Sequence, residues 1–544
     1  MIAWIQRRLG WVGLMALGIG AIAAYFRLTQ LGHQILIDDE WHALHALIRL
    51  DYQEIFLSFG HADHSIPLTL LFKAMAETIG LSEWRLRALP IMGGLVTVAL
   101  VPWLLRPWLR AYEPWVLGLL LALSPILIHF SRYVRPYALT IPLTFAAVIA
   151  LWRWWHEGKR EWIAVFVPAS VLAGWMHPLT LLFTGGALLW FGLVSMKDLL
   201  RHRDMSGLMR VVPPGLVMVA LSSALVLPPL LADPYSMAAK TGVHQLQWTT
   251  LIRAWELVAG VAHWGVAGPM LVLAMIGAVV LWQREKMFVL YWLFLTTLAG
   301  ITIVLLNPAW VHHALVPVRY LSIAIPWVLG LIAIGFVTVV QWLSQYNRPA
   351  MTASLAGGVM LAWFLGLLAV GPHWATYGQF NQFAGHMRYH FDYDFVRNPF
   401  SVVVDSVEMP EIYQTMADEP GDWTIIESPW RFESHYTPFS GFQRAHQMPM
   451  KIGMLTGLCS DWVVGELPYE DGRTQWSMTQ FVHLADLPEA VDDNAFVVIH
   501  REPMMEDIRA VPEVTPCIEA LDERLGQPWY ADESRVVYKV EAGS

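Results

Sequence analysis

Long apolar stretches recur along the first two thirds of the chain, and short polar segments separate them. A helix that crosses a bilayer needs about 20 mostly apolar residues, because lipid offers no partner to backbone N–H and C=O groups. The pattern therefore predicts an all-α polytopic membrane domain over residues 1–370, with about 11 transmembrane helices. The predicted spans are residues 10–27, 88–105, 115–131, 137–154, 162–177, 179–195, 212–231, 266–282, 287–306, 318–340 and 351–370.

The first span has an alternative interpretation as a signal peptide. Arg7 and Arg8 precede its apolar run, and Ala21-Ile22-Ala23 is a candidate cleavage site. The run from Trp11 to Phe26 exceeds the ~7–15 apolar residues of a signal peptide, which favours a retained span.

Residues 371–544 follow a different pattern, with short apolar runs between polar segments. The runs at 423–426, 496–499 and 536–538 are typical of strands, and residues 516–525 are typical of a helix. We therefore expect a small α/β domain. It contains both cysteines, Cys459 and Cys517, for which a disulfide and two unpaired buried thiols are both open.

Composition supports a membrane protein. The 544 residues are 56% hydrophobic and 15% charged, with 28 tryptophans, whereas soluble chains carry ~25% charged residues. These values exclude a disordered chain, a fibrous protein and a nucleic-acid-binding protein, and two cysteines exclude a disulfide-dense scaffold.

The charges are divided between the two parts of the chain. Residues 1–370 contain 24 Lys and Arg against 16 Asp and Glu, whereas residues 371–544 contain 11 against 28. With the N-terminus inside, short inner segments hold 14 of the 24 basic residues. This orientation predicts a multi-pass protein of the plasma (bacterial inner) membrane, with a cytoplasmic N-terminus. Residues 371–544 then form an extracytoplasmic, periplasmic domain.

Half of the acidic residues of the membrane part lie in its first outer loop, residues 28–87. Asp38, Asp39 and Glu40 come shortly after the first span. One of several adjacent carboxylates near lipid can be less solvated, have a raised pKa and accept a proton from a nucleophile. The alternative is a solvated helix end with ordinary surface charge.

The same loop contains His61, Asp63 and His64 within four positions. Such side chains can bind a divalent metal, orient a sugar or polarise a leaving phosphate. Their spacing is not that of a structural zinc site, so a hydrogen-bonding or structural role is the favoured alternative.

Arginines on the predicted outer side run against the positive-inside trend. Arg132 and Arg135 lie in Ser131–Tyr137, between the third and fourth spans, and Arg319 opens the tenth. Arg binds phosphate through two N–H groups, so a lipid-linked phosphate suits these positions. The alternative is an anchor to ordinary headgroups. His177 is another outer polar residue, but a lone His at a helix end carries no specific prediction.

The order of these motifs resembles the GT-C superfamily of integral-membrane glycosyltransferases. The most similar branch is the protein O-mannosyltransferase and lipid A aminoarabinose transferase group (PMT-like, glycosyltransferase family 39-like). The likeness rests on Asp38-Asp39-Glu40, on Asp63–Leu68 with Glu83–Pro90, and on Arg132–Tyr137. It covers residues 1–340 in architecture and is motif-specific over 37–140. His64-Ser65-Ile66-Pro67-Leu68-Thr69 stands where the family often has a His-Pro-Pro-Leu-Tyr-like stretch.

The resemblance implies transfer of a hexosyl or pentosyl group from a polyprenyl-phosphate carrier to a hydroxyl of a lipid, glycan or protein acceptor. It implies amphipathic helices in the first outer loop, with Asp39 and Glu40 as catalytic residues and Asp38 as a rival base. Arg132, Arg135 and Arg319 would bind the donor phosphate. Asp38, His61, Asp63, His64 and Tyr137 would bind substrate. A divalent metal at His61, Asp63 and His64 is optional, and a single displacement implies inversion.

Two other classes of function compete with this one. A lipid or sugar transporter (flippase) would also need polar residues in a cavity, but transporters place ionisable residues near the bilayer midplane. A noncatalytic scaffold would present the acidic outer domain to partners. The concentration of acidic residues in one outer loop favours chemistry at the membrane surface.

Overall fold

The computed structural model describes part of the chain, and all structural statements below concern that part. It comprises residues 2–29, 31, 36, 40, 50–60, 65–242, 244–345, 358, 361–363, 365–373, 408–428, 439–452, 494–502 and 514–541. The chain divides into two compact units. The first contains residues 1–29, 89–375 and 388–396, and the second contains residues 30–88, 376–387 and 397–544. The predicted domain boundaries at 370 and 371 stay a prediction.

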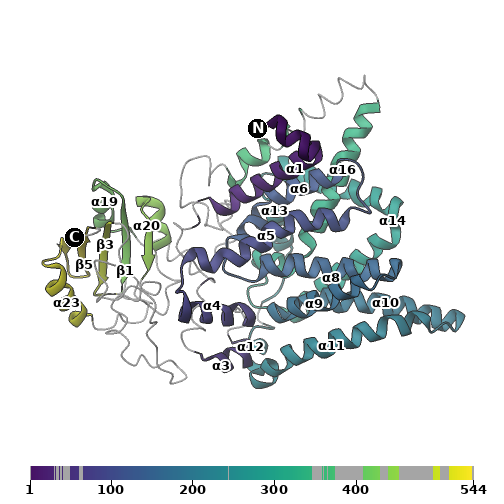
Figure 1. Cartoon of the computed structure of the whole chain (residues 1–544), viewed down its shortest axis with the longest axis horizontal. Coiled ribbons are helices and arrows are strands. Elements are labelled where there is room, and N and C mark those ends of the chain that lie inside the picture. The colour runs from purple at the N-terminus through teal and green to yellow at the C-terminus, as the bar shows by residue number, and fades with distance from the viewer. Residues whose placement is uncertain are drawn as a thin grey trace. The chain divides into compact units, whose positions relative to one another are not determined.

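The first unit is built from helices (Figure 1), several of them long and apolar. Its helices are α1 (Ile2–Leu28), α5 (Glu83–Leu105, which begins in the second unit), α6 (Glu113–Leu123), α7 (Pro125–Ser131), α8 (Tyr137–Glu157), α9 (Glu161–Met176), η2 (Pro178–Thr180), α10 (Leu181–His202), α11 (Ser206–Ala232), α12 (Pro234–Ala238), α13 (Trp248–Ala259), α14 (Trp264–Leu306), α15 (Leu315–Tyr320) and α16 (Ala324–Gln345).

Several of these helices have the length and composition of membrane spans. Among the described residues six qualify, and a seventh does if α6 and α7, which meet at a bend of 58°, form one span. The six are α5, α8, η2 with α10, α11, α14 and Ala324–Leu343 of α16. The chain is therefore a multi-pass membrane protein. The predicted total of about 11 spans stays a prediction.

Helix α14 accounts for two predicted spans at once. Its 43 residues, at about 1.5 Å each, would far exceed the ~30 Å hydrocarbon core of a bilayer if the helix were straight. Glu285 has non-helical dihedral angles (φ −148°, ψ 67°) and divides α14 into two helices. This break falls between the predicted spans 266–282 and 287–306.

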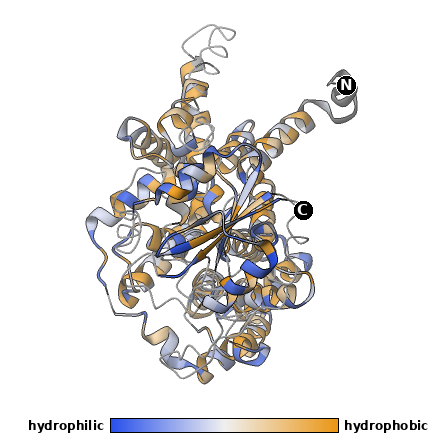
Figure 2. Cartoon of the chain, turned by 90° about the vertical axis from the view of Figure 1, so that its left-hand side faces the viewer, coloured by the Kyte–Doolittle hydropathy of each residue, from blue (hydrophilic) through white to orange (hydrophobic). Residues whose placement is uncertain are grey.

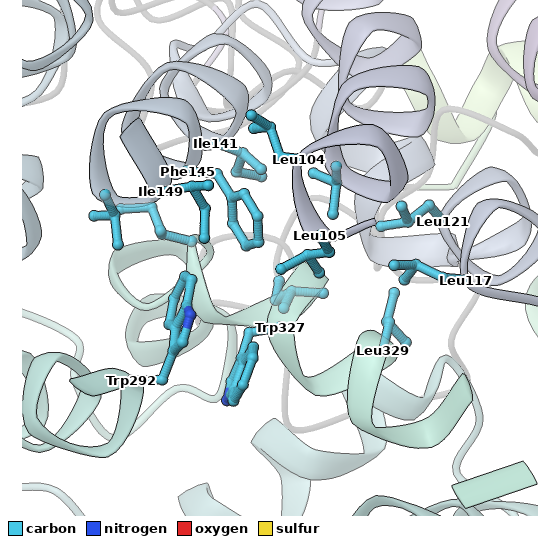
Figure 3. Packing of buried hydrophobic residues seen from close by; sticks show 14 of the residues in the cluster. Leu104, Leu105, Leu117, Leu121, Ile141, Phe145, Ile149, Trp292, Trp327 and Leu329 are labelled. Carbon is cyan, nitrogen blue, oxygen red and sulfur yellow. The ribbon is translucent and has the colours of Figure 1, made fainter. Parts of the chain in front are cut away.

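Aromatic stacking and close backbone approach join α14 to its neighbours. The rings of Trp292 and Trp327 stack with centroids 4.9 Å apart, and Phe145 of α8 lies 5.1 Å from Trp292 (Figure 3). Elsewhere a Cβ on Gly277 of α14 would overlap the backbone of α16, and a Cβ on Gly335 of α16 would overlap that of α14. In lipid, such small residues let helix backbones meet and gain packing that larger side chains prevent.

In the second unit, the segment predicted as the first outer loop contains α3 (Tyr52–Leu57) and α4 (Ile66–Thr78). Asp51 caps α3, with Glu54 completing a capping box. The buried residues of α4 recur at helical spacing and form one stripe, as expected for an amphipathic helix. Tyr52 donates a 2.6 Å hydrogen bond to Glu77, which joins α3 to α4. Burial, and after it this hydrogen bond, raises the pKa of Tyr52 to about 12.

The second unit also contains a five-stranded sheet in the order β2-β1-β3-β5-β4 (Figure 1). The strands are β1 (Trp423–Ser428), β2 (Met450–Ile452), β3 (Asn494–His500), β4 (Tyr530–Ala531) and β5 (Arg535–Val540). Strand β1 pairs in parallel with β2 and β3, whereas β5 is antiparallel to β3 and β4. The three strand-like runs of the sequence lie in β1, β3 and β5, and colouring by hydropathy shows the apolar character of these central strands (Figure 2).

The two faces of the sheet differ in chemistry. One face is apolar and packs against α23 (Thr515–Leu525), which contributes Cys517, Ile518 and Leu521. Cys517 is disulfide-bonded, and Cys459, the chain's other cysteine, lies outside the described residues.

The opposite face contains a buried polar cluster. Glu427 of β1 accepts a 2.8 Å bond from Tyr413 of α19 (Glu411–Asp418) and lies 2.5 Å from His500 of β3. His446, at the end of α20 (Phe439–His446), stacks on Tyr413. Because both oxygens of Glu427 have partners, the carboxyl group can stay buried, and these bonds link α19 to the sheet.

Helix contact through Gly277 can be tested by substitution. We expect Gly277→Leu to push α14 away from α16 and lower the free energy of unfolding by about 3 kcal/mol, the upper range for overpacking. Thermal unfolding in detergent micelles measures this. The control is Gly300→Leu on the same helix, where an added Cβ would meet no atom within 4 Å. Equal midpoints for the two variants would contradict the packing role.

Acid should destabilise the second unit through His446. Burial lowers the pKa of His446 from 6.5 to about 4. The folded state therefore binds this proton less readily than the unfolded chain, so stability is highest above pH 6.5 and falls as the pH drops toward 4. The expected loss is about 3 kcal/mol. Denaturant unfolding from pH 7 to 4 should show a shallower fall for His446→Asn, which keeps an acceptor for the backbone N–H of Met448.

Candidate functional site

Half of the predicted site residues belong to the described part of the chain. Those described are Glu40, Arg132, Arg135, Tyr137 and Arg319. Those outside it are Asp38, Asp39, His61, Asp63 and His64. Glu40 belongs to the second unit and the other four described residues to the first, so the two groups are treated separately.

Glu40 forms a buried ion pair with Arg87 of α5. Arg87 donates from Nε to Oε1 of Glu40 at 3.2 Å and from Nη2 to Oε2 at 3.0 Å. The side chain of Glu40 is 1% exposed, and that of Arg87 is 0% exposed. Arg87 Nη1 also donates to the carbonyl oxygen of Leu31 at 3.4 Å. The Arg87 guanidinium therefore binds both the carboxylate of Glu40 and the backbone carbonyl of Leu31, nine residues before Glu40.

This geometry affects what Glu40 can do. A two-pronged bond between guanidinium and carboxylate is short, directional and about twice as strong as a neutral hydrogen bond. In a buried setting, removing one partner leaves the other charge without compensation, at a cost of several kcal/mol. Glu40 is thus held in place with both oxygens engaged, an arrangement that suits positioning of the chain.

In the first unit, Arg132 binds the end of α1. Its Nη1 donates to three backbone oxygens, those of Phe26 at 3.2 Å, Arg27 at 3.4 Å and Thr29 at 2.7 Å. The last carbonyl groups of a helix have no partner within the helix, and a cation there is favourable. Arg132 is buried and lies at the end of α7, so it joins that helix to α1.

Arg27, which belongs to α1, in turn binds residues of α6 and α7. Pro125 has no N–H group to donate to Leu121, four residues earlier, so the carbonyl of Leu121 needs another donor. Arg27 supplies it from Nη2 at 3.2 Å and also donates to Ala122 and to the Ser131 hydroxyl. Arg27 therefore stabilises the break between α6 and α7.

A row of aromatic rings connects two other predicted residues. Tyr137, the first residue of α8, has its ring centroid 5.9 Å from that of His177, which follows α9. The His177 ring is 5.8 Å from Tyr320 at the end of α15. The guanidinium of Arg319 lies 5.1 Å from the centre of the Tyr320 ring. Arg135 is buried in the turn that precedes Tyr137.

Sequence reasoning did not assign roles to His177, Tyr320 and Arg27. The hydropathy pattern places all three near span ends, which is a weak signal because many polar and aromatic residues lie there. Their grouping depends on which helix ends meet in space.

The metal prediction concerns residues outside the described part. Within the described residues, no group of three or more His, Cys, Asp or Glu side chains has an arrangement that could bind a metal ion. Metal binding by His61, Asp63 and His64 stays a prediction.

Comparison with solved structures finds proteins whose backbones follow a similar path over most of this chain. ArnT from Cupriavidus metallidurans, a lipid A aminoarabinose transferase, is 15% identical in its apo state and 14% identical when bound to undecaprenyl phosphate. Both comparisons cover 97% of this chain and 98% of ArnT, with TM-scores of 0.42 and 0.41.

The archaeal oligosaccharyltransferase AglB from Archaeoglobus fulgidus, in complex with an inhibitory peptide and a dolichol-phosphate, is 10% identical. The comparison covers 82% of this chain and 64% of AglB, with a TM-score of 0.42. Comparisons with protein-family models and with curated proteins find no match.

Removing Arg87 should destabilise the second unit strongly. We expect Arg87→Ala to lower the free energy of unfolding by about 3–5 kcal/mol, because Glu40 keeps its buried charge without the ion-pair partner. Denaturant unfolding measures this loss, and Arg85→Ala, at an exposed position two residues away, is the matched control. The double variant Glu40→Ala/Arg87→Ala should lose less than the sum of the single variants. Additive losses would contradict a direct pair.

Proposed function

We propose that this chain is a membrane glycosyltransferase that acts on the outer face of the membrane. It transfers a hexosyl or pentosyl group from a polyprenyl-phosphate carrier to a hydroxyl of a lipid, glycan or protein. In this proposal the protein lies in the plasma (bacterial inner) membrane, with residues 371–544 extracytoplasmic. The observation that carries the proposal is the buried Glu40–Arg87 pair, which anchors the acidic segment after the first predicted span.

The ion pair supports a division of roles within Asp38-Asp39-Glu40. A general base must accept a proton, and Glu40 already accepts N–H bonds at both oxygens from Arg87. We assign proton acceptance to Asp39, the neighbouring residue in the sequence, and positioning to Glu40. Asp38 is assigned to substrate binding.

Arg319 and Arg135 are assigned to the carrier phosphate. Arg319 is partly exposed beside a tyrosine ring, and a guanidinium can bind phosphate oxygens through two N–H groups. Arg132, which the motif also nominates, uses its Nη1 to bind the end of α1. We therefore assign Arg132 mainly to holding that helix.

The reaction is a single displacement. The acceptor oxygen attacks the anomeric carbon, and its proton passes to Asp39. The bond between the anomeric carbon and the phosphate oxygen breaks, and its electron pair leaves with the carrier phosphate. Arg319 and Arg135 stabilise the negative charge that develops on the departing group. Attack from the face opposite the leaving group inverts the anomeric centre.

Transfer can be tested with purified full-length protein and labelled polyprenyl-phosphate sugars. We expect Asp39→Asn to lower kcat by about 10²–10⁴-fold, the usual contribution of a general base. Asp204→Asn, at an exposed residue between α10 and α11, is the control and should keep full activity. Unchanged turnover in Asp39→Asn would contradict the assigned base.

Arginine variants in the same assay separate the phosphate ligands from helix anchors. Arg319→Ala should raise the donor KM about tenfold or more, because a charge-assisted bond contributes ~1.5–3 kcal/mol. Movement of the carrier between leaflets without sugar transfer would favour a flippase and contradict the proposal.

A further inference from the structure

His177 occupies a central place in the aromatic row of the first unit. Its ring lies 5.9 Å from Tyr137 and 5.8 Å from Tyr320, at interplanar angles of 49° and 53°. The three residues come from the start of α8, the end of α9 and the end of α15. These helix ends are far apart in sequence, and His177 contacts both of the others.

The backbone of His177 is held firmly. Its N–H donates to the carbonyl of Ala173 at 2.9 Å. Its own carbonyl accepts from the backbone N–H of Thr180 at 3.0 Å and from the Thr180 hydroxyl at 2.9 Å. Pro178 follows and prevents α9 from continuing in a regular helix. The imidazole therefore projects from a fixed point.

Arg319 is connected to this row through Tyr320. An arginine side chain has many rotamers, so a partner that restricts them favours a productive position. Tyr320 is such a partner, because its ring lies beside the Arg319 guanidinium and its hydroxyl accepts from Nη2 at 3.4 Å. Tyr320 in turn packs against His177.

We propose that His177 is a positioning residue of the donor site, which fixes Tyr320 and through it directs Arg319 toward the carrier phosphate. This inference rests on the proposed transferase function and names a residue that the sequence motif does not contain. The proposed role depends on the ring of His177, through its contacts with Tyr137 and Tyr320.

The test compares donor KM with kcat in full-length protein. We expect His177→Ala to raise the donor KM roughly five- to tenfold with kcat within about twofold, since one aromatic contact is lost and the base is untouched. His177→Phe should restore most of the KM, because phenylalanine keeps a ring. The matched control is His156→Ala, whose ring stacks on Trp152 near the other end of α8, and it should leave the KM unchanged.

A double variant makes the test specific. If His177 acts through Tyr320, then His177→Ala/Tyr320→Leu should raise the KM no more than Tyr320→Leu alone. Additive effects, or a normal KM in His177→Ala, would overturn the inference while leaving the transferase function intact.

Equilibrium binding of a short-chain polyprenyl phosphate gives a second readout that does not depend on turnover. We expect its Kd to follow the donor KM through the same variants. A wild-type protein that neither binds this lipid nor transfers sugar would overturn both the inference and the proposed function. Thermal unfolding of each variant checks that it is folded. If His177→Ala does not fold, the comparison of His177→Phe with the wild-type protein still tests the inference.

Discussion

A guanidinium group that leaves water must receive hydrogen-bond acceptors from the protein, because an uncompensated buried charge costs several kcal/mol. This constraint recurs at the helix ends that carry the candidate residues. Arg27 and Arg132 bind backbone carbonyls at the ends of α6 and α1, and Arg87 binds a carboxylate and a carbonyl. Each of these arginines ties a segment near one helix end to another element. The surrounding backbone is thereby fixed before any substrate binds.

These contacts distinguish charged residues that hold the structure from those proposed to take part in the reaction. Arg132 and Glu40 are among the residues that the sequence motifs nominate for the site, yet both have strong partners within the protein. The groups proposed for chemistry lie beside them, with Asp39 next to Glu40 in sequence and Arg135 three residues after Arg132. An enzyme gains from such a division, because a reacting group placed by a rigid neighbour needs less reorganisation during the reaction.

The sheet of the second unit also buries polar groups together with their partners. One face is apolar and, among the described residues, packs against α23. The other face buries the carboxyl group of Glu427, which is tolerated because Tyr413 and His500 bind its two oxygens. Such a network is specific in geometry, since loss of any member leaves a buried polar group without its bond.

The sequence by itself determined the helical membrane character, the approximate positions of most described apolar helices and the strands β1, β3 and β5. These follow from local hydrophobic periodicity, which the bilayer and the sheet impose on consecutive residues. It also identified the segment of Glu40 and the arginines Arg132 and Arg319, because charge is conspicuous in an apolar chain. Only the tertiary structure decided that Glu40 pairs with Arg87 and that Arg132 caps α1. It alone brought His177 between Tyr137 and Tyr320, since contacts between helix ends distant in sequence depend on packing that leaves no periodic trace in the chain.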